Sequence, residues 1–175
     1  MTAAIFRREL FDQIGLLDET FESYLEDVDF GLRCALAGRA GLYVPSAIAY
    51  HRGSSTRGAW NSDTVRHISR NQVLLAAKHF RGQPLWPILA GQLLWGMLSL
   101  CHGRGFSYLR GKISGLNTAR KLSIGRAQRS ERESASVARE RFRAIIDASE
   151  NEIFALQQNT GFDRYWRAYF WLRRR

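Results

Sequence analysis

Three carboxylates crowd into four positions near the start of the chain. In residues 23–33, SYLEDVDFGLR, the acids Glu26, Asp27 and Asp29 stand between an aromatic residue and an apolar run. Acids in the first turn of a helix commonly offset the positive end of its dipole, each by about 0.3–1 kcal/mol. Three adjacent carboxylates exceed that need, because like charges repel and raise one another's pKa. The cluster is therefore a candidate functional site as well as a helix start.

A histidine follows the cluster at a suggestive place. His51 lies 51 − 27 = 24 residues after Asp27, at the end of a predicted strand, and opens the Gly- and Ser-rich stretch RGSSTRGAWNSD. Tyr24 and Leu25 precede the acids, so we expect at least one carboxylate at the partly desolvated edge of a cleft. By itself, a histidine at a strand end is more often an ordinary half-buried residue.

The elements that would position these residues alternate between helix and strand. Apolar spacing predicts a helix over residues 27–37, ended by Gly38, and a short helix before it that stops at Gly15. The segments 41–44 and 47–51, divided by a proline, read as two short strands. A longer helix follows over residues 65–80 and carries Arg70-Asn71. The pattern predicts an α/β arrangement for residues 1–80.

The charge is distributed unevenly along the chain. Residues 1–100 hold 10 Lys and Arg against 9 Asp and Glu, whereas residues 101–175 hold 16 against 7, so most of the net charge of +10 lies in the second part. Residues 82–103 carry no Asp, Glu, Lys or Arg. Residues 84–101 are borderline for a membrane span, which needs roughly 20 apolar residues, and their prolines favour a position on the bilayer instead.

A basic amphipathic helix is predicted next. Four apolar residues, at positions 106, 109, 113 and 116, share one face of this helix, with basic residues toward the other faces. Such a helix suits an anionic membrane surface. The residues predicted to contact the membrane are Trp86, Trp95, Arg110, Lys112, Arg120 and Lys121.

Residues 1–80 resemble a known enzyme family. Several ordered elements carry the resemblance: a hydrophobic-Arg-Arg start, Gly15-x-x-Asp18-Glu19-x-Phe21, Glu26-Asp27-x-Asp29, Arg33, Gly38, Tyr-x-Pro, a lone His51 and Arg70-Asn71. In this order they resemble the C-terminal half of the catalytic domain of family 2 inverting glycosyltransferases of the GT-A type, and most of all the rhamnosyltransferase-like branch, which builds cell-wall and surface polysaccharides. The resemblance implies half of an α/β GT-A fold in residues 1–80, followed by an all-helical membrane-associated extension in residues 81–128 and a basic, aromatic helical extension in residues 129–175.

The resemblance also implies roles for the acidic cluster. Asp27 would take the proton of the acceptor hydroxyl as that oxygen attacks the anomeric carbon of a nucleotide-diphospho sugar. Glu26 and Asp29 would orient the site and the acceptor, and His51 would bind the divalent cation, Mg²⁺ or Mn²⁺, that the leaving diphosphate requires. Arg33 would pair with an acid of its own helix or reach phosphate, and Arg70 and Asn71 would support the cleft.

The implied partners follow from this chemistry. They are a nucleotide-diphospho sugar, with rhamnose as a candidate sugar, and a glycan or lipid-linked acceptor. The third partner is the cytoplasmic face of the inner membrane, where the protein would be peripheral. The family's nucleotide-binding half has no counterpart among these residues. We therefore expect the chain to be a truncated gene product, one piece of a split enzyme or a fragment of a longer reading frame, and to be inactive alone.

Two other classes of function compete with this interpretation. In the first, a non-catalytic membrane-surface or subunit-interaction module, the acids only cap a helix and the basic helices bind. In the second, the basic and aromatic C-terminal residues bind nucleic acid. The second is disfavoured, since the charge lies beside an apolar, tryptophan-bearing stretch, which suits an interface better; we therefore expect no nucleic-acid partner.

Overall fold

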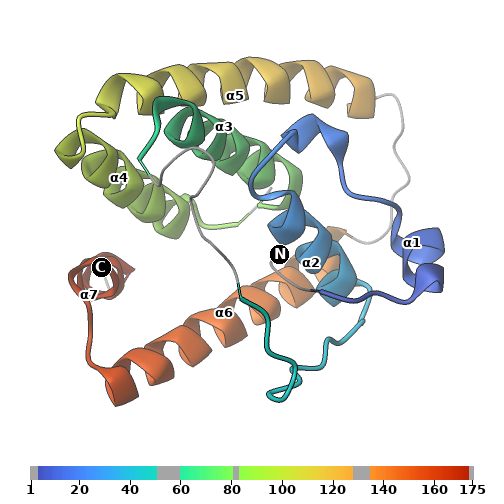
Figure 1. Ribbon diagram of the computed structural model, residues 1–175. Coiled ribbons are helices and arrows are strands. Elements are labelled where there is room, and N and C mark those ends of the chain that lie inside the picture. Colours follow the sequence, from blue (N-terminus) through green and yellow to red (C-terminus); the bar gives the residue numbers. More distant parts are fainter. Residues whose placement is uncertain (1–3, 51–59, 81–82, 128–134, 174–175) are drawn as a thin grey trace.

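The computed structural model describes residues 4–50, 60–80, 83–127 and 135–173, and within these residues the chain is helical (Figure 1). The elements are α1 Arg8–Ile14, the short 3-10 helix η1 Glu19–Phe21, α2 Glu26–Leu36, α3 Ser62–His79, α4 Leu85–Cys101, α5 Gly105–Ala127, α6 Ala135–Thr160 and α7 Arg164–Arg173.

The predicted α/β fold is wrong for the described part of the chain, which contains helices and no strand. Residues 41–50, where two strands were expected, follow an irregular path and are exposed, with Leu42 at 94% and Tyr50 at 98% exposure. A strand needs a neighbour to pair its N–H and C=O groups. A backbone hydrogen bond within this segment joins Ala47 N to Val44 O and closes a turn instead.

The helices predicted around the acidic cluster are confirmed. α1 is followed by Gly15 at φ +83°, and Gly38, at φ +72°, follows the end of α2, as expected for residues that terminate helices in a left-handed conformation. α3 begins three residues before the predicted helix and ends one residue before its predicted end, and Asn61 caps its start by accepting a hydrogen bond from Asp63 N.

Helix α3 is the central element, and α5 packs directly along it (Figure 1). Two glycines of α5 make this approach possible: a Cβ on Gly111 would lie 2.4 Å from Arg66 O, and a Cβ on Gly115 would lie 2.6 Å from Arg70 O. The backbones of α3 and α5 therefore touch where larger residues would hold them apart.

The remaining helices surround this pair. α4 packs against α5, α3 and α7, and α6 packs against α2. Phe142 of α6 is buried and meets Phe80 edge to face at a ring separation of 4.7 Å, so α6 covers the C-terminal end of α3. Within the described residues, none of the helices combines the length and the apolar character that crossing a bilayer would require.

Candidate functional site

Asp29 anchors helix α2 to the end of α3. Its side chain is fully buried, and its Oδ1 lies 2.7 Å from both Lys78 Nζ and His79 Nε2. Its Oδ2 accepts a hydrogen bond of 2.9 Å from Arg33 Nε, one turn further along α2. Both oxygens of this carboxylate are thus engaged by basic groups, as a buried charge requires.

The charges around Asp29 decide its protonation. Burial raises the pKa of this carboxyl, but the hydrogen bonds from His79 and Lys78 and the charges of Lys78 and Arg33 outweigh it and lower the pKa to about 2. Asp29 is therefore ionised at neutral pH and acts as the fixed negative centre of the site.

Arg33 joins α2 to the turn that follows α1. Its Nη1 donates to Ile14 O and its Nη2 donates to Leu16 O, each at 2.7 Å, while its Nε donates to Asp29. The guanidinium fork thus holds two backbone carbonyls and one carboxylate together. Arg33 therefore pairs with an acid of its own helix, which is one of the two roles predicted for it.

The backbone immediately before the acidic cluster is strained. Glu22, Tyr24 and Leu25 have φ values of +59°, +71° and +66°, a region that side chains other than glycine rarely adopt. Leu25 is also the residue that precedes the first turn of α2, and its side chain makes no capping hydrogen bond. Strain of this kind persists where surrounding contacts over-determine it, which is common at functional sites.

Asn71 and Arg70 of α3 supply those contacts. Asn71 is fully buried, and its Nδ2 donates to Phe21 O, Ser23 O and Tyr24 O at 2.7, 2.8 and 2.7 Å. Arg70 Nη1 donates to Thr20 O at 2.9 Å and to Asn71 Oδ1 at 2.8 Å. Two adjacent side chains of α3 therefore bind four backbone carbonyls of the segment that leads into α2.

Glu26 and Asp27 stand on the first turn of α2, directly after this turn, and both are partly exposed. Asp27 Oδ1 accepts a hydrogen bond of 2.9 Å from Val28 N. Glu26 Oε2 is buried and accepts no hydrogen bond within the described residues. Carboxylates at a helix N-terminus are stabilised in their ionised form by the helix dipole.

A metal site is not assembled by the described residues. His51, the expected ligand, lies outside them. Among the residues that the structure describes, no three His, Cys, Asp or Glu side chains come close enough to hold a metal ion. The carboxylates present therefore do not fit a divalent cation without further ligands.

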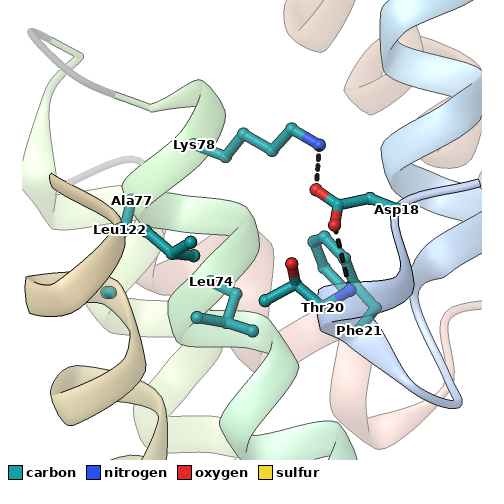
Figure 2. A pocket seen from close by; sticks show the side chains of 8 residues that line it. Asp18, Thr20, Phe21, Leu74, Ala77, Lys78 and Leu122 are labelled. Carbon is teal, nitrogen blue, oxygen red and sulfur yellow. Dashed lines mark hydrogen bonds and ion pairs between the residues drawn. The ribbon is translucent and has the colours of Figure 1, made fainter. Parts of the chain in front are cut away.

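A shallow pocket lies beside the acidic cluster rather than on it (Figure 2). Asp18 stands at its edge, where its carboxylate meets Lys78 Nζ at 2.6 Å and accepts a hydrogen bond of 3.0 Å from Thr20 N. Burial raises the pKa of Asp18, but the hydrogen bonds from Lys78 and Thr20 outweigh this effect. The pKa is therefore below its usual value, and Asp18 is ionised at neutral pH. The pocket is lined by Asp18, Thr20, Phe21, Leu74, Ala77, Lys78, Ala119 and Leu122, and it excludes Asp27.

The residues predicted to contact a membrane do not share one environment. Trp95 points into the protein, where its Nε1 donates to Ser69 Oγ at 3.0 Å. Lys112 lies between helices, with its Nζ against Gln72 Oε1 and Gln92 Oε1, and burial lowers its pKa to about 7. Trp86 is partly exposed and donates to Leu172 O. The exposed basic members are Arg110, Arg120 and Lys121.

Lys78 and His79, which engage Asp29, were not among the site residues predicted from the sequence. A signal was present, because Lys78 follows Asn71 by seven residues, two turns of a helix, and so lies on the same face. The burial of Asp29, one of three similar acids, was not predicted either. The apolar residue of the cluster, Val28, faces outward at 42% exposure instead.

Comparison with known proteins yields a partial relative. Over 76 residues the chain is 38% identical to the N-acetylglucosaminyl-diphospho-decaprenol L-rhamnosyltransferase of Mycobacterium tuberculosis, in each of two strains. The match covers 43% of this chain and 25% of the relative, so the chain spans about a quarter of the curated relatives that it matches. No family model matches the chain, and no solved structure matches it. Part of this chain is thus similar to part of a glycosyltransferase.

Proposed function

We propose that this chain supplies the acceptor-activating part of a glycosyltransferase, with Asp27 as the general base. The observation that carries the proposal is the different exposure of the three acids. Asp29 is buried and anchors α2, whereas Glu26 and Asp27 are partly exposed at the start of that helix. Arg70 and Asn71 bind the strained backbone that precedes it. The partial similarity to a rhamnosyltransferase supports sugar transfer as the reaction.

In the proposed reaction, the acceptor hydroxyl oxygen attacks the anomeric carbon of the donor sugar. As that C–O bond forms, the Asp27 carboxylate takes the hydroxyl proton. The bond from the anomeric carbon to the diphosphate oxygen breaks, and the nucleotide diphosphate leaves on the opposite face with the electron pair, so the anomeric configuration inverts. A positioned base of this kind contributes about 10²–10⁴ in rate. Glu26 is proposed to contact the acceptor, one residue away from the base.

The substrate class is proposed from the name of the relative. That protein is named for L-rhamnose transfer to N-acetylglucosaminyl-diphospho-decaprenol. We propose a nucleotide-diphospho-rhamnose donor and a lipid-diphosphate-linked sugar acceptor. The matched segment covers 25% of the relative.

The test introduces a single substitution into the gene in its source cells, so that the protein lacks one carboxylate. Asp27→Asn keeps the shape of the side chain and removes the base, so transfer of labelled rhamnose to the lipid fraction by membranes of these cells should fall at least about 100-fold. Asp12→Asn is the matched control, because Asp12 is an exposed acid of α1, and it should transfer at the unmodified rate. Immunoblotting checks that each variant accumulates normally. Unchanged transfer by Asp27→Asn would remove Asp27 from the mechanism.

A further inference from the structure

Helices α4 and α5 each expose a continuous apolar stripe. The exposed members on α4 recur every three or four residues, and so do those on α5, which is the spacing of one helix face. Scattered exposed apolar residues need no explanation, but two full stripes on neighbouring helices form a patch of the kind that marks an interaction site. The residues are Trp86, Leu89, Leu93, Met97 and Leu100 on α4, and Phe106, Leu109, Ile113 and Leu116 on α5.

The two stripes point to the same side of the molecule. On α4, Trp95 reaches α3 through Ser69, and the stripe occupies the helix positions on the other side. On α5, Gly111 and Gly115 face α3, and the stripe again lies away from them. Since α4 and α5 contact each other and both pack against α3, we infer that the two stripes form one face that looks away from α3. We call these nine residues the α4–α5 face.

The charged side chains of α4 and α5 have one sign. Residues 64–130 contain eleven Lys or Arg and no Asp or Glu. Arg110, Arg120 and Lys121 are exposed along α5 beside the apolar stripe. An apolar stripe flanked by basic groups matches a surface that is apolar below and anionic above, which is the character of a bilayer with anionic headgroups.

We propose that the α4–α5 face docks this protein onto an anionic lipid surface, with the apolar side chains among the headgroups and acyl boundary and the basic side chains against the lipid phosphates. The two helices lie along the surface. This inference goes beyond the proposed sugar transfer and stands without it. It also revises which side chains contact lipid, because Trp95 and Lys112 point inward.

A second copy of the chain fits this face less well. A two-fold dimer through the α4–α5 face would bring the same basic residues of both copies together, with no acid in residues 64–130 to offset them. Like charges across an interface oppose association. An anionic bilayer supplies the opposite charge and the apolar layer at once.

The first test uses the 175-residue chain and sedimented vesicles, made of phosphatidylcholine alone or mixed with phosphatidylglycerol. The chain should bind the mixed vesicles and not the neutral ones. Ile113→Glu should weaken that binding at least about tenfold, since it removes an exposed apolar side chain that would enter the bilayer and adds a charge that anionic headgroups repel. Leu156→Glu is the matched control, because Leu156 of α6 is 57% exposed and Ile113 is 61% exposed; it should bind as the unmodified chain does.

The second test reverses charge. Arg110→Glu with Arg120→Glu should weaken binding to the mixed vesicles at least about tenfold, whereas Arg39→Glu with Arg139→Glu, also at exposed positions, should change it less than about threefold. Circular dichroism confirms that each variant remains helical. The proposal is overturned by equal binding to both kinds of vesicle, by full binding of Ile113→Glu, or by ultracentrifugation showing that Ile113→Glu abolishes a dimer while vesicle binding persists.

Discussion

At the scale of single residues, identical side chains acquire different tasks from their surroundings. Asp27 and Asp29 differ by two positions, yet Asp29 is fully buried against basic groups while Asp27 stays partly exposed. The difference arises because α2 turns one face to α3 and the other outward. The buried acid holds the helix, and the partly exposed acid is the proposed general base.

Replacement of Asp29 should therefore damage the fold more than any other change in the cluster. Asp29→Asn leaves Lys78 and Arg33 without their carboxylate, and breaking a buried pair in this way costs about 3–5 kcal/mol. Urea denaturation measures the loss in free energy of unfolding. Asp12→Asn, on the exposed side of α1, should change it by less than about 0.5 kcal/mol.

The same residue predicts an acid-sensitive fold. The pKa of Asp29 is lowered from 3.8 in a free carboxyl to about 2 in the folded protein. Its contribution to stability is therefore complete above pH 3.8 and is lost as the pH falls through about 2. Thermal unfolding followed across this range should show a fall in the melting temperature that is smaller in Asp29→Asn. An equal fall in both proteins would contradict this origin.

At the scale of elements, the local pattern predicts helices but not their partners. The spacing of apolar residues and the placement of Gly15 and Gly38 were sufficient for the helices around the cluster. Residues 41–50 have strand-like composition, but a strand depends on pairing with a segment elsewhere in the chain. No described segment supplies that pairing, so the local preference has no effect.

Replacement of two glycines by alanine should change the free energy of unfolding in opposite directions, because Gly111 lies in the contact between α3 and α5 and Gly31 does not. Gly111→Ala places a Cβ 2.4 Å from Arg66 O and should destabilise the protein by about 1–3 kcal/mol. Gly31→Ala, in α2, meets nothing within 4 Å and should stabilise it by about 0.5–1 kcal/mol, because alanine favours a helix. Urea denaturation of both variants measures the two changes. Equal effects would show that helix propensity, and not the close approach, governs Gly111.

At the scale of the whole molecule, the uneven charge should make stability depend on salt. The chain carries a net charge of +10, and residues 64–130 contribute basic groups without any acid. Folding brings these groups together, so screening by salt should raise the melting temperature. Arg110→Glu with Arg120→Glu should reduce this dependence. A melting temperature that falls with added salt would show that attractive ion pairs dominate instead.

What the sequence alone determined is local or additive: the acids at the start of a helix, the glycines that end the helices, the excess of basic residues, and the similarity that a partial glycosyltransferase relative supports. The tertiary structure decided what depends on partners distant in the chain. It buried Asp29 against Lys78 and His79, turned Lys112 inward, and left residues 41–50 without strand pairing. The reason is that helix periodicity is set by near neighbours, whereas burial and pairing are set by whatever the folded chain brings alongside.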